Sequence, residues 1–197
     1  MGLLTNLPQG LRVSVDDAFA SQKLGRGLWQ GVYQLALTKE NLVALCIGTD
    51  RSTGDALGPL TGSFLEELAC PRLEVIGTLA QPVHATNLQE TIHTLHERPI
   101  KPCIIAIDAC LGKLESVGKI SLAKGALSPG AGVNKDLPPV GDYHMVGIVN
   151  VSGFMEHLVL QNTRLNLVYQ MAGIIADAIS TVCYRLSASY FSAGKSR

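Results

Sequence analysis

The stretch LVALCIGTDRSTGDALGPL, residues 42–60, decides the fold class of this chain. It begins with a short, continuous apolar run, Leu42–Ile47, of the kind that forms strands buried on both faces of a parallel sheet. A polar, glycine-rich loop follows, and apolar residues then recur at helical spacing from Leu57. The stretch therefore predicts a strand, a loop and a helix in succession.

The same alternation continues along the chain. Further apolar runs rich in valine and isoleucine predict buried strands at Leu73–Leu79, Cys103–Ala109 and Met145–Val151. Segments with helical spacing separate or follow these runs, and the longest is Leu165–Leu186. Strands that alternate with helices indicate right-handed crossovers, so we expect an α/β fold with a mostly parallel sheet.

Length and composition favour one domain. A chain of 197 residues, 47% of them hydrophobic and 16% charged, can bury a single core. We expect one α/β domain over residues 1–197, with 1–40 as an N-terminal covering segment and 192–197 as a flexible tail. The stretch from Lys124 to His144 holds four glycines and three prolines. It is expected to be a functional or mobile loop.

The balance of charge excludes some classes of partner. Sixteen basic residues match sixteen acidic ones, so the basic surface expected of a nucleic-acid binder is missing. The N-terminus has no signal-peptide pattern, and no apolar run approaches the roughly 20 residues of a membrane span. Five cysteines without a CxxC pair are expected to be reduced thiols. We expect a cytoplasmic protein without membrane or nucleic-acid partners; a homo-oligomer is compatible with the sequence.

Two aspartates follow predicted strands. In an open parallel sheet, ligands bind beyond the carboxyl ends of the strands. Asp55 lies in the loop after the first strand, and Asp108 ends the third. If the strand order is 2-1-3, these strands are neighbours and the two carboxyls share one crevice. Such a pair can divide acid and base roles or hold a divalent metal. The structural alternatives are a helix N-cap for Asp55 and a turn residue for Asp108.

Further polar residues surround the predicted crevice. Arg51 could bind a carboxylate or another anion, and Gly48, Thr49 and Gly54 are expected to contact the substrate. The N–H groups of the loop glycines could stabilise an oxyanion. His84 follows the second strand and could reach the same edge. The loop lacks the GK[ST] ending of a P-loop, so nucleotide binding is not favoured.

Five motifs together resemble a known family. They are LCIGTDRSTGDALGPLTGSFL, GTLAQPVHATNL, IAIDACLG, PGAGVNKDLPPVGD and GIVNVSGFMEHLVLQNTRLN, and they cover most of the chain from Leu45 to Asn166. They are similar to the successive motifs of the YyaC-type sporulation proteins of endospore-forming bacteria. The resemblance implies a three-layer α/β/α sandwich of the phosphorylase/hydrolase type and a role in the sporulating cell.

That family is more distantly similar to the spore germination protease and the hydrogenase maturation endopeptidases. The resemblance places the two essential aspartates of the germination protease at Asp55 and Asp108. In the endopeptidases a later histidine joins two acids in metal contact, and His144 is the nearest candidate by chain order. The resemblance thus implies a peptidase-like hydrolase acting on a peptide or protein, with a divalent metal as a variant. The competing interpretation is a non-catalytic sporulation factor that binds a peptide or partner protein in the same crevice.

Overall fold

A computed structural model gives the structure of the chain, and it describes residues 10–36, 41–129 and 138–193. The elements follow one another in this order: β1 (Leu11–Ser14), α1 (Ala20–Ala36), β2 (Leu42–Cys46), the 3-10 turn η1 (Gly54–Ala56), α2 (Leu57–Glu67), β3 (Leu73–Ile76), α3 (Leu88–His96), β4 (Cys103–Gly112), the 3-10 turn η2 (Leu114–Ser116), β5 (Lys119–Lys124), β6 (Tyr143–Val151), α4 (Glu156–Gln161) and α5 (Leu165–Ala193).

The strands form one sheet in the order β1-β5-β6-β4-β2-β3. Strands β3, β2, β4 and β6 are parallel to their neighbours in this series, whereas β5 pairs antiparallel with both β1 and β6. The mostly parallel sheet expected from the sequence is therefore confirmed. The 2-1-3 order is confirmed as well, because β2 lies between β3 and β4.

The sequence analysis missed two strands, the edge strand β1 and its neighbour β5. In both β1 (LRVS) and β5 (KISLAK), apolar residues alternate with polar ones, because only one face of these strands is buried. Such an alternating pattern contains no continuous apolar run, so these two strands were not predicted. Strand β1 falls within the segment 1–40, so that segment contributes an edge strand as well as the covering helix α1.

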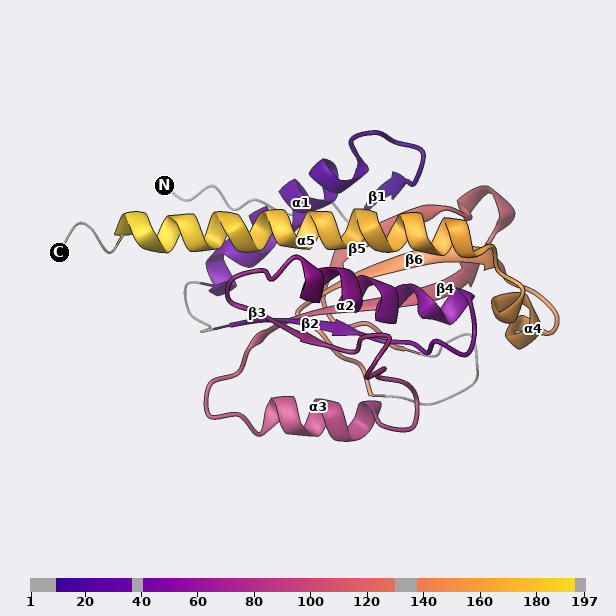
Figure 1. Cartoon of the computed structure of the whole chain (residues 1–197), viewed down its shortest axis with the longest axis horizontal. Helices are drawn as coiled ribbons and strands as arrows, with labels where there is room; N and C mark the ends of the chain where they lie inside the picture. Colours follow the sequence, from indigo (N-terminus) through magenta and orange to yellow (C-terminus); the bar gives the residue numbers. More distant parts are fainter. Residues whose placement is uncertain (1–9, 37–40, 130–137, 194–197) are drawn as a thin grey trace.

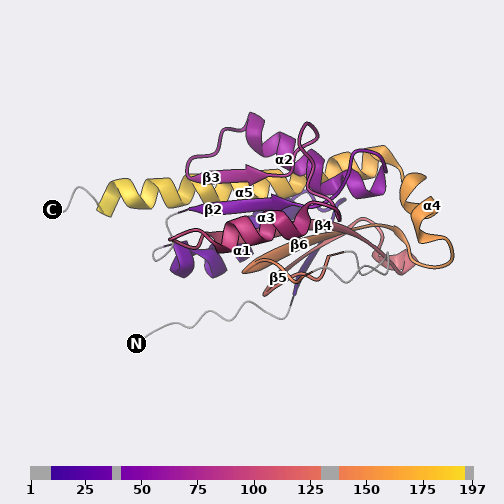
Figure 2. The ribbon, with the colours of Figure 1, turned by 90° about the horizontal axis from the view of Figure 1, so that it is seen from below.

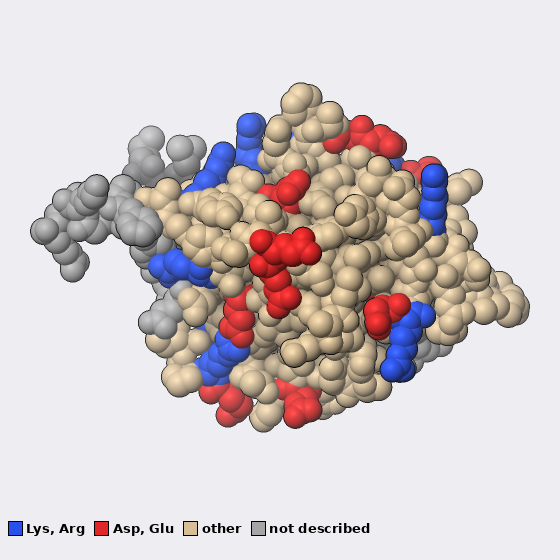
Figure 3. All heavy atoms as spheres, in the orientation of Figure 1, with Lys and Arg blue, Asp and Glu red and all other residues tan. Residues whose placement is uncertain are grey.

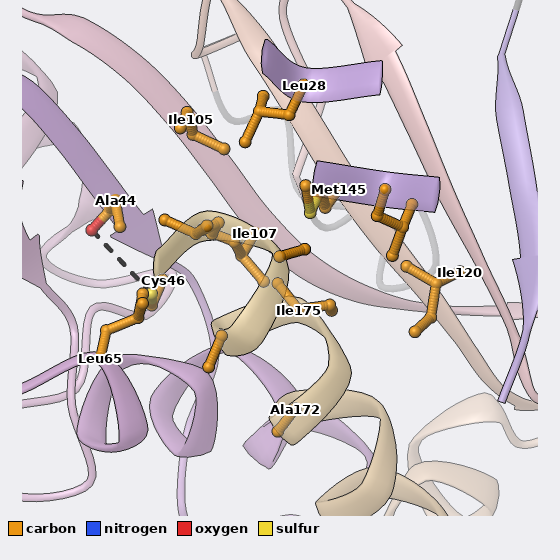
Figure 4. Close-up of a cluster of buried hydrophobic side chains, with 14 of the residues drawn as sticks. Leu28, Ala44, Cys46, Leu65, Ile105, Ile107, Ile120, Met145, Ala172 and Ile175 are labelled. Carbon is orange, nitrogen blue, oxygen red and sulfur yellow. Dashed lines mark hydrogen bonds between the residues drawn. The ribbon is translucent and has the colours of Figure 1, made fainter. Parts of the chain in front are cut away.

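Helices cover both faces of the sheet and make three layers. Helices α1, α2 and α5 lie on one face and α3 on the other (Figures 1 and 2). The side chains of β2 alternate accordingly: Ala44 and Cys46 belong to the larger core beneath α5, and Val43 and Leu45 to the smaller core beneath α3. Figure 4 shows part of the larger core, where Ile107, Met145 and Ile175 meet between sheet and helix.

Helix α5 is long and apolar enough to cross a membrane over Leu165–Ser189, where the mean hydropathy of the best window is 1.3. The expectation that no apolar run approaches this length is therefore wrong. Half of that window is buried inside the fold, against the sheet, α1 and α2. Its fully buried residues include Val168, Met171, Ile175, Ile179 and Val182. The apolar stripe of α5 is thus accounted for by the core of the domain.

Other expectations about segments have mixed outcomes. The expected loop from Lys124 to His144 is partly structured, because Leu127 and Val140 form an antiparallel bridge and β6 begins at Tyr143. Residues 130–137 lie outside the described residues. The expected tail at 192–197 overlaps the end of α5, and the rest of this tail also lies outside the described residues.

On the face shown in Figure 3, acidic and basic side chains are interspersed and most of the surface is uncharged.

Candidate active site

The loop after β2 closes on itself and carries Asp55 to the carboxyl edge of the sheet. The Gly48 N–H donates a hydrogen bond to Val83 O (2.8 Å), and the Thr49 N–H donates one to Asp55 O (3.1 Å). Gly48 has a φ of 147°, and a Cβ atom there would lie 2.0 Å from Asp55 O. Only glycine allows this approach, so Gly48 fixes the position of Asp55.

Replacing Gly48 by alanine should therefore disrupt the loop. A methyl group would have to displace the Asp55 backbone, and the positive φ adds strain, so we expect a loss of about 2–4 kcal/mol in the free energy of unfolding. Urea denaturation measures it. Gly153→Ala is the matched control, because no atom lies within 4 Å of a Cβ at Gly153. Equal stability of the two variants would contradict the close approach at Gly48.

Asp55 is not a helix cap. The N-cap residues of η1 and α2 are Thr53 and Ala56, and neither cap has a side-chain hydrogen bond. Burial raises the pKa of the Asp55 carboxyl above its usual value. The buried Ser52 hydroxyl near Asp55 offsets part of that rise, and the charge of His157 offsets a further part. The side chain is therefore suited to hold a proton that an exposed aspartate would lose.

Strand β4 extends beyond β2 and creates a step in the carboxyl edge. The Ile47 N–H donates to Ile107 O at 2.8 Å, and from Asp108 onward β4 continues to Gly112 alongside β6. Asp108 is thus within the strand, and the expectation that it ends the strand is wrong. Its Oδ1 atom accepts a hydrogen bond from the Ala109 N–H (2.8 Å). The half-buried carboxyl lies at the base of the step.

The two acids lie on neighbouring elements. The turn η1, which carries Asp55, packs against β4, which carries Asp108. Side-chain alternation along β4 assigns Asp108 to the face beneath α3, together with Ile104 and Ala106. Asp108 is not among the groups that shift the pKa of Asp55. The two acids therefore lie on contacting elements at one edge of the sheet, with Asp108 on the face beneath α3.

The other predicted substrate contacts are spread around the same loop. His84 directly follows Val83, which bridges Ile47, and its Nδ1 lies 2.9 Å from Thr86 Oγ1. This segment and β4 therefore flank the start of the loop from opposite sides. Thr49 accepts a hydrogen bond at Oγ1 from the N–H of Arg51 (3.3 Å), whose side chain is exposed.

Gly54 serves helix packing. A Cβ atom at Gly54 would lie 2.7 Å from Leu160 Cδ2, so the absence of a side chain lets α4 lie directly on η1. The residue is buried beneath this contact. Its observed role is to bring α4 next to Asp55.

The expected metal ligands do not come together. Among the residues that the structure describes, no three His, Cys, Asp or Glu side chains are close enough to hold a metal ion. His144 lies on β6 in register with Ala106, two residues before Val146, the partner of Asp108. Its Nδ1 lies 2.8 Å from Gly125 O, which orients the ring toward the end of β5. A metal centre built from Asp55, Asp108 and His144 is therefore not formed in this arrangement.

Cys110 is poorly placed to act as a nucleophile. Burial raises the pKa of its thiol to about 11, and the negative charge of Asp108 adds to the rise, whereas Arg12 opposes it. The thiolate is the nucleophilic form, so this residue is almost entirely unreactive thiol at neutral pH. The acids remain the better candidates for chemistry at this edge.

His157 is a site residue that the sequence analysis missed. It lies three residues before Leu160 on α4, and therefore on the same helix face, which rests on Gly54. Its charge lowers the pKa of Asp55. In the sequence, His157 is one of three histidines on predicted helices, and only the packing of α4 distinguishes it.

Removing His157 should change the pH dependence of any reaction that needs protonated Asp55. Without the positive charge, the pKa of Asp55 rises further, so activity should persist to higher pH in His157→Gln than in the parent protein. The pH profile of kcat measures this shift. His93→Gln, an exposed histidine on α3, is the control. An unchanged alkaline limb in His157→Gln would contradict the coupling.

Exposed apolar side chains precede and line α4. Phe154 is 92% exposed, Met155 59% and Leu158 44%; we call these three residues the α4 apolar surface. Met155 also has a positive φ of 60°, which is uncommon for a residue other than glycine. Apolar groups gathered on a surface mark interaction sites more often than scattered ones do. This surface borders the helix that covers the Asp55 turn.

Two hollows in the described part of the chain lie away from these residues. One of about 410 Å³ lies between β1 and α1 and is lined by Phe19, Lys23 and Arg26, among others. Another of about 210 Å³ lies near the start of β4, beside His96 and Asp142. Neither is lined by a predicted site residue, so cavity size gives no support to a site in either place.

Comparison with known proteins identifies the family. The family described as "Protein of unknown function (DUF1256)" matches residues 12–178. The chain belongs to this family. It is also 51% identical over 171 residues to the "Uncharacterized protein YyaC" of Bacillus subtilis (strain 168), a match that covers 85% of this chain and 81% of the relative. The resemblance to YyaC-type proteins is thereby confirmed.

A solved structure shares the fold of this DUF1256 member. The NiFe hydrogenase maturation protease HycI from Thermococcus kodakarensis KOD1 superposes with a TM-score of 0.51 at 17% sequence identity, over 78% of this chain and 98% of that one. At this identity the likeness concerns the fold alone. The expected three-layer α/β/α sandwich of the hydrolase type is therefore confirmed, and it is a fold that a maturation protease also uses.

Proposed function

We propose that this DUF1256 protein is a peptidase-like hydrolase of the sporulating cell, acting in the cytoplasm on a peptide or protein through Asp55 and Asp108. The observation that carries the proposal is the step in the carboxyl edge, where β4 extends beyond β2 with Asp108 at its base and the η1 turn holds Asp55 alongside. The shared fold with a maturation protease supports the reaction class. The motif resemblance to the germination protease supports the choice of residues.

The raised pKa of Asp55 is the basis on which the proposal divides the roles of the two acids. Burial favours a proton on Asp55, so Asp55 is the general acid and Asp108 the general base. Asp108 takes a proton from water as the water oxygen bonds to the amide carbon. Asp55 then gives its proton to the departing nitrogen as the carbon–nitrogen bond breaks. The products are a carboxylic acid and an amine, and no covalent enzyme intermediate is needed. Asp108 then releases its proton to water and Asp55 takes one up, which restores the starting state.

The loop backbone offers little to the oxyanion. The N–H groups of Gly48 and Thr49 are already donated to Val83 O and Asp55 O. In this proposal the exposed guanidinium of Arg51 supplies positive charge near the loop. In this proposal, Arg51 and His84 contact the substrate on the two sides of the loop start.

The α4 apolar surface favours a second candidate function. Three exposed apolar side chains beside the Asp55 turn could bind a peptide or partner protein without any cleavage. The chain would then be a non-catalytic sporulation factor that uses the same edge. Both functions involve a polypeptide, and they differ in whether an amide bond is broken.

A peptide library separates the two functions. The purified protein is incubated with peptides from a digest of sporulating cells, and new termini are identified by mass spectrometry. Hydrolase function predicts cleavages that recur at a defined sequence and disappear in Asp55→Asn and in Asp108→Asn. Cleavages that persist in both variants would refute the assignment. Peptides retained by the protein with no new termini would favour the binding factor.

A further inference from the structure

Half of the sheet face beneath α3 has no helix over it. The core beneath α3 takes side chains from β2, from the first half of β4 and from the segments around them, but none from β1, β5 or β6. Figure 2, seen from that side, shows β5 and β6 beside α3 rather than beneath it. The side chains that these strands direct to this face are therefore not packed beneath a helix of the described chain.

Cross-strand pairing places four of these side chains in one row. Arg12 on β1 pairs with Ser121 on β5. Val146 on β6 pairs with Ser121 on one side and with Asp108 on the other, so the row ends at the candidate base. The sequence neighbours of all four residues point into the larger core, which places the four side chains together on the opposite face. The open half of the face is thus continuous with the candidate active site.

The Arg12 side chain extends along this row. Its Nε donates a hydrogen bond to Ser121 Oγ at 3.0 Å, and the residue is exposed. Its charge also opposes the rise in the pKa of Cys110, which lies two residues after Asp108 on the same face. Neighbouring strands lie about 4.8 Å apart, so a guanidinium held over β5 lies about 10 Å from the strand that carries Asp108. A short peptide segment can therefore contact both residues.

Lys119 adds a second cation to the same face. It is half-buried and pairs with Ser14, the next residue after Arg12 on this face of β1. Strands β1, β5 and β6 contain no aspartate or glutamate. Among the described residues, neither Arg12 nor Lys119 forms an ion pair. Two cations beside the hydroxyls of Ser14 and Ser121 are complementary to an anion.

We propose that Arg12 and Lys119 form a subsite for an acidic side chain of the substrate polypeptide, which crosses the open face of β5 and β6 with its scissile amide at Asp108. The inference rests on the proposed function and adds the substrate class, an extended polypeptide with an aspartate or glutamate near the bond that is cut. An extended chain advances about 3.3 Å per residue, so the acidic residue should lie about two or three residues from the scissile amide.

The peptide library tests the subsite through the sequences that the protein selects. The digest of sporulating cells is incubated with the parent protein and with Arg12→Glu, and both the cleaved and the retained peptides are sequenced by mass spectrometry. The parent should select peptides with an aspartate or glutamate about two or three residues from the cleaved bond. Arg12→Glu should lose this preference and select lysine or arginine at that position. Arg26→Glu is the control, because Arg26 is exposed on α1, across the sheet from this face.

The outcomes separate the subsite from the hydrolase. Acidic peptides that are retained through Arg12 but never cut would support the subsite and refute the hydrolase. Cleavage without an acidic preference, or with a preference that Arg12→Glu keeps, would overturn the subsite and leave the hydrolase in place. A carboxylate needed only at the C-terminal end of the peptides would overturn the assignment to a side chain. Neither cleaved nor retained peptides would refute both proposals.

One selected peptide gives the size of the effect. The amide analogue of its acidic residue should raise KM about tenfold and leave kcat nearly unchanged, because a charge-assisted hydrogen bond away from the reacting bond affects binding alone. Arg12→Gln should show the same loss with the acidic peptide and none with the amide peptide. For a peptide that is bound without cleavage, the dissociation constant replaces KM. Equal losses of Arg12→Gln with both peptides would overturn the subsite, because the loss would not depend on the carboxylate.

Discussion

Asparagine in place of Asp108 is expected to lower kcat/KM by about 10²–10⁴-fold on a peptide found in the library. The amide cannot accept the proton of the attacking water, and its shape preserves the packing of β4 beside β6. Asp55→Asn should lose a similar factor, because the leaving nitrogen would then receive no proton from the loop. Initial rates at several substrate concentrations measure both losses.

An exposed aspartate of the same loop provides the control. Asp50 lies five residues before Asp55 and faces solvent, so Asp50→Asn makes the same side-chain change in the same loop without touching the proposed chemistry. Its kcat/KM should stay within a factor of about three of the parent value. Equal losses in Asp50→Asn and Asp55→Asn would mean that the loss does not depend on the carboxyl of Asp55 in particular, which would contradict the proposed acid.

Serine in place of Phe154 is expected to raise KM by about 10–100-fold and to leave kcat nearly unchanged. Burial of a phenylalanine side chain against a substrate stabilises the complex by about 1.5–3 kcal/mol, and contact away from the reacting bond changes binding alone. Because Phe154 is 92% exposed, the free energy of unfolding should change by no more than about 0.5 kcal/mol. Kinetics on the same peptide measure KM and kcat separately.

Phe19→Ser is the matched control for that substitution. Phe19 is also exposed, but it lies in the turn before α1, away from α4. Its KM should equal that of the parent. If Phe154→Ser and Phe19→Ser behave alike, the α4 apolar surface does not contact the substrate. If the protein binds peptides without cleaving them, the dissociation constant takes the place of KM and the same comparison holds.

The central strands could be predicted from the sequence because burial on both faces requires continuous apolar runs. Leu42–Cys46 and its parallel neighbours carry that pattern, and their alternation with helices determines the topology. Strands β1 and β5 could not be found in this way, because they bury one face only. The helical spacing of Leu165–Leu186 did predict α5, whose apolar residues pack against the sheet and two helices.

The candidate site was only partly accessible from the sequence. The sequence indicated a site at the carboxyl edge of the sheet, from Gly48 and from the acids near the ends of two predicted strands. In a parallel sheet the carboxyl ends of all strands lie at the same edge. Three features of the site depend on tertiary packing and could not be predicted from local sequence patterns. These are the extension of β4 beyond Asp108, the burial that raises the pKa of Asp55, and the contact of α4 with Gly54 that brings His157 to Asp55.

The central claim is that Asp55 and Asp108 act in the same reaction. The most direct test is kcat/KM of the double variant Asp55→Asn/Asp108→Asn against each single variant. Residues that act as a unit give strongly non-additive losses in kcat/KM. The kcat/KM of the double variant should therefore lie no more than about tenfold below that of the less active single variant. Losses that multiply, so that the double variant falls by the product of the two single factors, would show independent effects and contradict the shared mechanism.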